Sequence, residues 1–306
     1  MRKSKTGLIA VLLLVVSLGL LTFGVSRLKK RNTRPVAMTS VKALKSPDER
    51  LELEFLLAED GTPMYTLFKD GEAIVQPSRL GFQLRGTLKA SVIKYDGDEV
   101  LKEDERPENS FHDGFVVEDV HASTFDETWE PVWGEEAQIR NHYNEMTVDL
   151  LQKATGRKMS VCFRLYDDGL GFRYLFPYQK NLSYFVIKEE LTEFAMAGDH
   201  TAWWIPGDFD TQEYEYTECR LTEIGDRFEE ALCGNSSQTP FSKNGVQTAL
   251  IMKTDAGKYI TLHEAELVNY PCMHLLLDPE TLIFRSFLTP DAQGWKGQVQ
   301  TPCHTP

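Results

Sequence analysis

The stretch 158–176 reads KMSVCFRLYDDGLGFRYLF, and it indicates how the chain folds. Val161, Phe163 and Leu165 recur at a period of two, which is typical of a strand with one buried face. Asp167-Asp168-Gly169 then supplies turn residues of the kind that reverse a chain between antiparallel strands. We therefore expect a β-hairpin over this stretch.

The same pattern recurs on both sides of this hairpin. Two further hairpins and two further strands are predicted: 64–68 with 72–75 around Lys69-Asp70-Gly71, 249–252 with 259–263 around 254–257, and single strands at 51–57 and 282–288. No long amphipathic helix and no internal repeat intervene. Repeated antiparallel strands bury their apolar faces by packing sheet on sheet, so we expect an all-β fold of two packed antiparallel sheets.

Composition excludes two classes of protein. Hydrophobic residues make up 42% of the 306 residues and aromatic residues 11%, which is enough to build a core and excludes a disordered chain. Residues 1–34 hold eight basic residues and no acidic one, so residues 35–306 hold 25 basic and 46 acidic residues, a net charge of −21. Such an acidic body argues against nucleic acid as a partner.

The N-terminus carries a predicted signal peptide or membrane anchor at residues 1–31. Residues 8–25 are almost wholly apolar, and a helix crosses a bilayer with roughly 17–25 residues. The run is long and is followed by basic residues, so we favour an uncleaved anchor over a cleaved signal. Five basic residues after the span and three before it would leave the body in the cytoplasm, although large domains can be exported despite that bias. Residues 32–45 are predicted to be a polar linker.

Three stretches contain residues suited to binding. They are 128–136 with its continuation 139–145, 202–216 and 235–241. The first two mix aromatic residues with carboxylates. Aromatic faces pack on sugar rings, and carboxylates accept hydroxyl hydrogen bonds or bind calcium. Composition equally allows buried structural tryptophans and solvated acids. The five cysteines form no CxxC pair, so neither a zinc site nor a compact disulfide framework is indicated.

These stretches also carry a family resemblance, in strings that occur in a fixed order along the chain. They are Ser46-Pro47-Asp48, 125–129, 131–136, 139–145, 167–174, 204–208, 210–214, 236–241, His263-Glu264-Ala265 and 300–303. From about residue 42 to the last residue, the chain resembles glycoside hydrolase family 97 and, more narrowly, its starch-utilisation α-glucosidase branch.

The resemblance implies an architecture. Members have an N-terminal β-super-sandwich of the galactose-mutarotase-like kind, then a catalytic (β/α)8 barrel, then a small β-domain. A family motif at the end of the sandwich reads Thr-Pro-Trp-Arg, and Thr305-Pro306 are the last residues of this sequence. We therefore expect residues 46–306 to be the sandwich and the barrel to be missing. The branch is inverting and its acid and base are barrel glutamates, so no catalytic residue is assigned to this chain.

The resemblance also implies a cofactor and partners. The branch holds an active-site calcium, and one of its ligands comes from the sandwich at the position matching Glu213. A single carboxylate supplies at most two of the roughly 6–8 oxygens that calcium takes, so the site would be shared with the barrel. Trp204 and Gln238 are our candidate substrate-binding residues. The expected partners are α-glucan oligosaccharides, a barrel in cis or in trans, and the membrane through residues 8–25.

We thus expect a sandwich module that forms one wall of an α-glucosidase active site and is inactive alone. It would lie on the periplasmic side, anchored in the membrane or released by signal cleavage. The alternative is a non-enzymatic module that docks a separate barrel or binds saccharides through Trp129, Trp133, Trp203 or Trp204.

Overall fold

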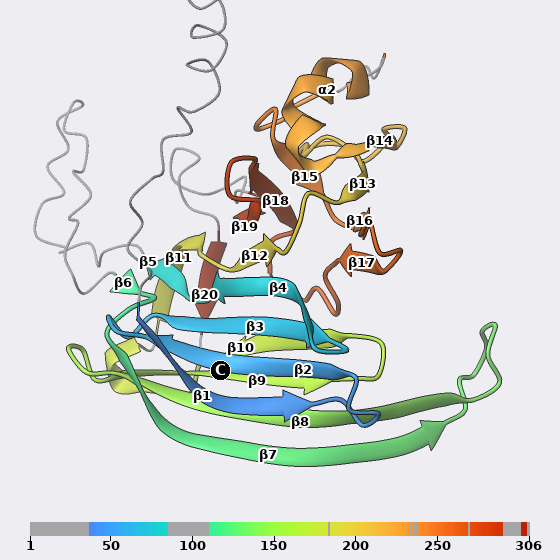
Figure 1. The fold of residues 1–306 in the computed structure, drawn as a ribbon. Coiled ribbons are helices and arrows are strands. Elements are labelled where there is room, and N and C mark those ends of the chain that lie inside the picture. The colour runs from blue at the N-terminus through green and yellow to red at the C-terminus, as the bar shows by residue number, and fades with distance from the viewer. Residues whose placement is uncertain are drawn as a thin grey trace, which may run out of the picture. The chain divides into compact units, whose positions relative to one another are not determined.

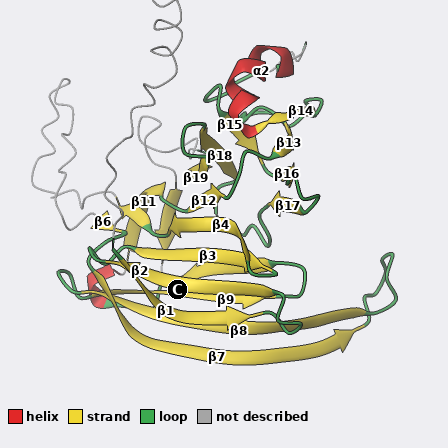
Figure 2. Ribbon diagram, in the orientation of Figure 1, coloured by secondary structure: helices red, strands yellow, loops and turns green. Residues whose placement is uncertain are grey.

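The computed structural model describes residues 37–84, 110–182, 184–232, 234, 238–268, 270–289 and 301–304. Strands are the main regular structure of these residues (Figures 1 and 2), and the α-helix they include is the short α2 (Ile224–Ala231). In chain order the strands are β1 (Met38–Lys45), β2 (Leu51–Ala58), β3 (Pro63–Lys69), β4 (Glu72–Arg79), β5 (Phe82–Leu84), β6 (Ser110–Phe111), β7 (Phe115–Trp129), β8 (Ile139–Gln152), β9 (Arg157–Leu165), β10 (Leu170–Leu175), β11 (Tyr184–Glu190), β12 (Glu193–Met196), β13 (Thr201–Trp204), β14 (Thr217–Arg220), β15 (Gly245–Gln247), β16 (Leu250–Lys253), β17 (Tyr259–Leu262), β18 (Met273–Asp278), β19 (Ile283–Leu288) and β20 (Thr301–His304). Two 3₁₀ turns are η2 (Lys180–Leu182) and η3 (Leu221–Glu223).

The described strands form four sheets rather than the two we predicted. The largest has the order β1-β2-β3-β4-β12-β19-β18-β15, and the others are β10-β9-β8-β7, β20-β11-β5-β6 and β14-β13-β16-β17. The strand pairs are antiparallel, as expected. Periodicity predicts that a segment is a strand, but it does not predict which strands pair with it. The sequence therefore did not show that the hairpin at 250–262 belongs to a separate small sheet.

The predicted hairpins are confirmed, with strand ends that differ by at most one residue except in β4, which continues to Arg79 rather than ending at residue 75. The hairpin quoted first is β9 and β10, and those around Asp70-Gly71 and Gly257 are β3–β4 and β16–β17. Asp70 and Gly71 have φ of 53° and 81°, the left-handed conformation that a tight two-residue hairpin turn requires at both positions. The Asp-Gly pair in the sequence therefore correctly predicted this turn.

The core of the sandwich lies between β2–β3 and β9–β10. Phe55 and Phe163 approach to 6.1 Å between ring centroids, and Tyr65 and Phe172 to 5.5 Å. The predicted face of β9, formed by Val161, Phe163 and Leu165, is fully buried. Large aromatic side chains that interlock from two layers supply most of the burial that stabilises such a fold.

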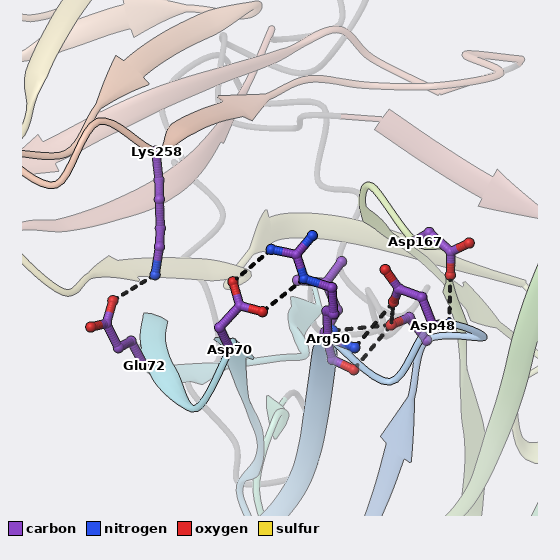
Figure 3. A network of polar contacts seen from close by, with 8 residues as sticks. Asp48, Arg50, Asp70, Glu72, Asp167 and Lys258 are labelled. Carbon is purple, nitrogen blue, oxygen red and sulfur yellow. Dashed lines mark hydrogen bonds and ion pairs between the residues drawn. The ribbon is translucent and has the colours of Figure 1, made fainter.

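A polar network connects the turn after β1 with the turn between β9 and β10, and Figure 3 shows it from close by. The backbone N–H of Asp48 donates to Asp167 at 2.8 Å, and the Ser46 hydroxyl donates to Asp48 at 2.6 Å. Arg50 makes a two-point contact with Asp70 at 2.8 and 3.0 Å. Two strings that carried the family resemblance, 46–48 and 167–174, are thus in direct contact.

The predicted linker needs a correction. Residues 38–45 form β1, which pairs with β2, so the linker cannot extend to residue 45. The strand reads as polar because it lies at the edge of the large sheet and, of its eight residues, only Leu44 is buried. The predicted membrane span at 8–25 lies outside the described residues. No helix among the residues that the structure describes is long and apolar enough to cross a bilayer.

Candidate functional site

The loop between β13 and β14, residues 205–216, is organised around the carboxylate of Asp208. This side chain is only 2% exposed. Its Oδ1 accepts hydrogen bonds from the backbone N–H of Asp210 and Thr211, at 2.8 and 3.2 Å, and its Oδ2 accepts the Tyr214 hydroxyl at 2.7 Å. The carboxylate therefore holds the loop that follows it in one conformation.

The same carboxylate joins this loop to residues 238–241. The backbone N–H of Thr239 donates to Oδ2 at 2.7 Å, and the Thr239 hydroxyl donates to Oδ1 at 3.0 Å. Burial acts to raise the pKa of Asp208, but the hydrogen bonds from Asp210, Tyr214 and Thr239 outweigh it and hold the pKa below its ordinary value. Two of the three stretches singled out in the sequence are thus brought together by one ionised residue.

A stack of aromatic rings packs against this loop. Phe241 stacks on Phe287 at 4.2 Å and on Phe209 at 5.3 Å between centroids. The His274 Nε2 lies 2.8 Å from the carbonyl oxygen of Asp208, and burial lowers the pKa of this imidazole. A neutral ring that donates through Nε2 fits that contact. The loop is therefore held by packing as well as by hydrogen bonds.

Gly207 has a steric role in this arrangement. A Cβ at this position would overlap the Phe241 ring and lie 3.0 Å from the backbone of Gly245. Glycine therefore allows the loop to cross the aromatic stack at close range.

Glu213 lies on this loop with an exposed side chain, and its backbone N–H donates to the Thr211 hydroxyl at 3.1 Å. A carboxylate oxygen is the ligand type that calcium prefers. The described residues contain no group of three or more His, Cys, Asp or Glu side chains placed to hold a metal ion. Glu213 thus fits calcium in kind, but these residues do not form a complete site.

Trp204 is not placed where a sugar could reach it. The side chain is 0% exposed, and its Nε1 donates to the Cys219 Sγ at 3.2 Å within the core. This placement disagrees with the predicted substrate-binding role. Gln238 is exposed, and its Nε2 donates to the Leu232 carbonyl at 3.1 Å. A substrate contact by Gln238 stays a prediction.

The remaining stretch, 128–136 with 139–145, lies at the end of the β7–β8 hairpin. We call residues 125–143 the arm. Here β8 continues beyond its pairing with β9, which begins at Asn144. Arg140 of β8 donates two hydrogen bonds to the Asp126 carboxylate of β7, at 2.8 and 2.7 Å, and this ion pair joins the two strands. Trp133, in the turn of the arm, is 88% exposed. The arm is therefore a two-stranded ribbon whose turn exposes Val132 and Trp133 beside glutamates.

Comparison with known proteins agrees with the resemblance in the sequence. The family model for the glycosyl-hydrolase 97 N-terminal domain matches residues 44–306. A glycoside hydrolase family 97 enzyme from Pseudoalteromonas sp. strain K8, solved in complex with acarbose, is 26% identical with a TM-score of 0.66, and the match covers 86% of this chain and 34% of that one. A variant of a family 97 enzyme from the same strain, in complex with panose, matches at 26% identity and a TM-score of 0.67 with the same coverage.

A β-arabinopyranosidase shares the fold at 18% identity with a TM-score of 0.66, over 87% of this chain and 38% of that one. The chain thus spans little more than a third of the length of these solved enzymes. Since the family model covers most of the sequence, the chain belongs to the glycosyl-hydrolase 97 N-terminal family.

Proposed function

We propose that the chain is the N-terminal module of an α-glucosidase-like glycoside hydrolase acting on α-glucan oligosaccharides. It forms one wall of the active site beside a catalytic domain, and it contributes Glu213 to a calcium site that the catalytic domain completes. The observation that carries this proposal is the loop at 205–216, which the buried Asp208 holds in a fixed conformation with Glu213 exposed on it.

The two acids on this loop differ in burial, and we assign their roles accordingly. Asp208 already accepts five hydrogen bonds from the protein, so its oxygens serve the structure of the loop. Glu213 is exposed and can reach a ligand outside the module. A preorganised loop presents such a ligand at a smaller entropic cost than a mobile one. Because one carboxylate cannot complete a calcium site, the module alone is expected to be inactive as a hydrolase.

The test is a chimera in which this chain replaces the N-terminal third of the Pseudoalteromonas enzyme. The measurement is the calcium concentration that gives half-maximal hydrolysis of maltotriose. Glu213→Gln should raise that concentration by about tenfold or more, since loss of a charged ligand weakens metal binding strongly. Glu215→Gln, an exposed acid on the same loop, is the matched control and should leave it unchanged. Equal calcium requirements in the Glu213→Gln chimera and its parent would refute the assignment.

The same proposal gives the arm a role in contacting the catalytic domain. The adjacent Val132 and Trp133 are 100% and 88% exposed, and Trp is enriched where one protein surface covers another. We assign the end of the arm to contact with the catalytic domain. Oxidative footprinting should then modify Trp133 in the module and spare it in the chimera, whereas equal modification in both would refute the contact.

We further propose that residues 8–25 anchor the module on the periplasmic side of the membrane. A chain that stays with membranes after alkaline carbonate extraction, and keeps Met1 on N-terminal sequencing, would support an anchor. A chain that is extracted and begins after residue 25 would instead indicate a cleaved signal.

A further inference from the structure

The small sheet β14-β13-β16-β17 has one face in the core and one face in solvent. Ala202 and Trp204 of β13 are fully buried, whereas Trp203 between them points to the opposite face. Ile251 and Thr261 stand in register with Trp203 across β16 and β17. Figure 1 places these strands together, in the region coloured yellow to orange.

The solvent face carries two aromatic rings in contact. Trp203 and Tyr259 lie 6.3 Å apart between centroids with their planes inclined by only 20°. Tyr259 is 65% exposed. We call the face formed by these two rings and their polar neighbours the Trp203–Tyr259 platform. Trp203 is partly buried. An exposed ring such as that of Tyr259, with a partly exposed ring beside it, offers flat apolar area, which suits the C–H face of a sugar ring.

Trp203 is held by a contact at the edge of its ring, and Tyr259 by a cation placed over its ring. Trp203 Nε1 donates to Glu218 Oε2 at 3.0 Å, and Glu218 is its register partner on β14. The ammonium of Lys253 lies 5.4 Å from the centre of the Tyr259 ring. Rings that are already oriented lose little conformational freedom when a ligand stacks on them, so more of the contact energy appears as affinity.

The polar neighbours indicate a neutral ligand. Glu218 and Lys253 carry opposite charges, and Arg220 contacts Asp255 at 2.7 Å, so the charges of the platform balance locally. The acidic body of the chain disfavours anionic polymers. Charged residues are depleted from the centres of protein–protein interfaces, which makes a protein partner a poorer fit for this face.

We propose that the Trp203–Tyr259 platform binds a neutral oligosaccharide. Sugar rings stack on the two aromatic side chains, while the Glu218 carboxylate and the Thr261 hydroxyl hydrogen-bond to sugar hydroxyls. The binding goes beyond the proposed role of Glu213, because it requires neither calcium nor a catalytic domain.

The test is calorimetric titration of the full chain with maltoheptaose, in EDTA and in a detergent without a sugar headgroup. We expect saturable binding that Tyr259→Ala weakens at least tenfold. Tyr259→Leu keeps an apolar side chain in case the alanine variant fails to fold, and it should weaken binding likewise. Tyr178→Ala, the matched control, removes a tyrosine ring that is 72% exposed outside this sheet and should bind like the parent chain.

Several results would overturn the proposal. They are the absence of saturable heat with the parent chain, an unchanged affinity in Tyr259→Leu, loss of binding in Tyr178→Ala, and binding that appears only when calcium replaces EDTA. A parent chain that sediments as a dimer, and a Tyr259→Leu variant that sediments as a monomer, would show that a second copy covers this face and would also overturn it. None of these results depends on the chimera, so the two proposals can fail separately.

Discussion

Replacing Asp208 with asparagine should destabilise the domain more than any other single-atom change in the loop at 205–216. Asparagine keeps Oδ1, which can still accept from Asp210 and Thr211, but it places an NH₂ group where Oδ2 accepts from Tyr214 and Thr239. The Tyr214 hydroxyl can rotate and become an acceptor. The Thr239 backbone N–H cannot, so it is left facing another donor.

The size of the effect follows from these contacts. A buried donor without a partner costs about 1–3 kcal/mol, and the remaining hydrogen bonds lose the added strength that a charged acceptor provides. We therefore expect Asp208→Asn to lower the free energy of unfolding by about 3 kcal/mol. For a domain of this size that corresponds to a fall in Tm of roughly 6–12 °C. Urea unfolding followed by tryptophan fluorescence measures the change in free energy.

The pH dependence of the free energy of unfolding provides a second test of the role of Asp208. Because the pKa of Asp208 is lowered by folding, its stabilising effect is fully present above the unfolded value of about 3.9 and is lost as the pH falls through the lower folded value. The difference between the parent and Asp208→Asn should thus be constant at neutral pH and shrink below about pH 4.

The control is Asp210→Asn, an exposed acid in the same loop, which should change stability by less than about 0.5 kcal/mol. If Asp208→Asn proves as mild as Asp210→Asn, or if its effect does not vary with pH, then Asp208 does not organise this loop.

Three further substitutions test other parts of the account. Trp204→Ala should lower the free energy of unfolding by about 3–5 kcal/mol in urea titration because it empties a fully buried site, and a loss of sugar binding without loss of stability would contradict this. Gly207→Ala should cost about 1–3 kcal/mol, since its Cβ would overlap the Phe241 ring, and an unchanged Tm would argue against that contact. Gly71→Val should cost about 1–2 kcal/mol because φ is 81° there, with Gly71→Asn milder, and thermal unfolding that ranks the two variants in the reverse order would contradict the turn geometry.

Local signals in the sequence identified eight of the twenty strands that the structure describes. Turn residues and a period of two are properties of neighbouring residues, so the hairpins at Asp70-Gly71 and Asp167-Asp168-Gly169 could be predicted without any knowledge of the fold. The division into four sheets could not, because strand order depends on contacts between distant segments. The edge strand β1 was missed because a strand with one buried residue has no apolar alternation.

The site shows the same limit at the level of single residues. Trp203 and Trp204 are adjacent on β13, so one side chain must point into the core and the other toward solvent. Because the two side chains are identical, their own type does not predict which of them is buried. Their neighbours could have decided it, since Ala202 shares a face with Trp204 and the more polar Thr201 shares one with Trp203. The contact between Asp208 and Thr239 had no local signal, because the two residues are 31 positions apart along the chain.

The measurement that tests the central claim most directly is glucose release from maltotriose, in calcium, by the chain alone and by the chimera. The account predicts no release by the chain alone and calcium-dependent release by the chimera, because under the proposed function the module would supply a wall and one metal ligand while the catalytic domain supplies the acid and the base. Glucose release by the chain alone would contradict it.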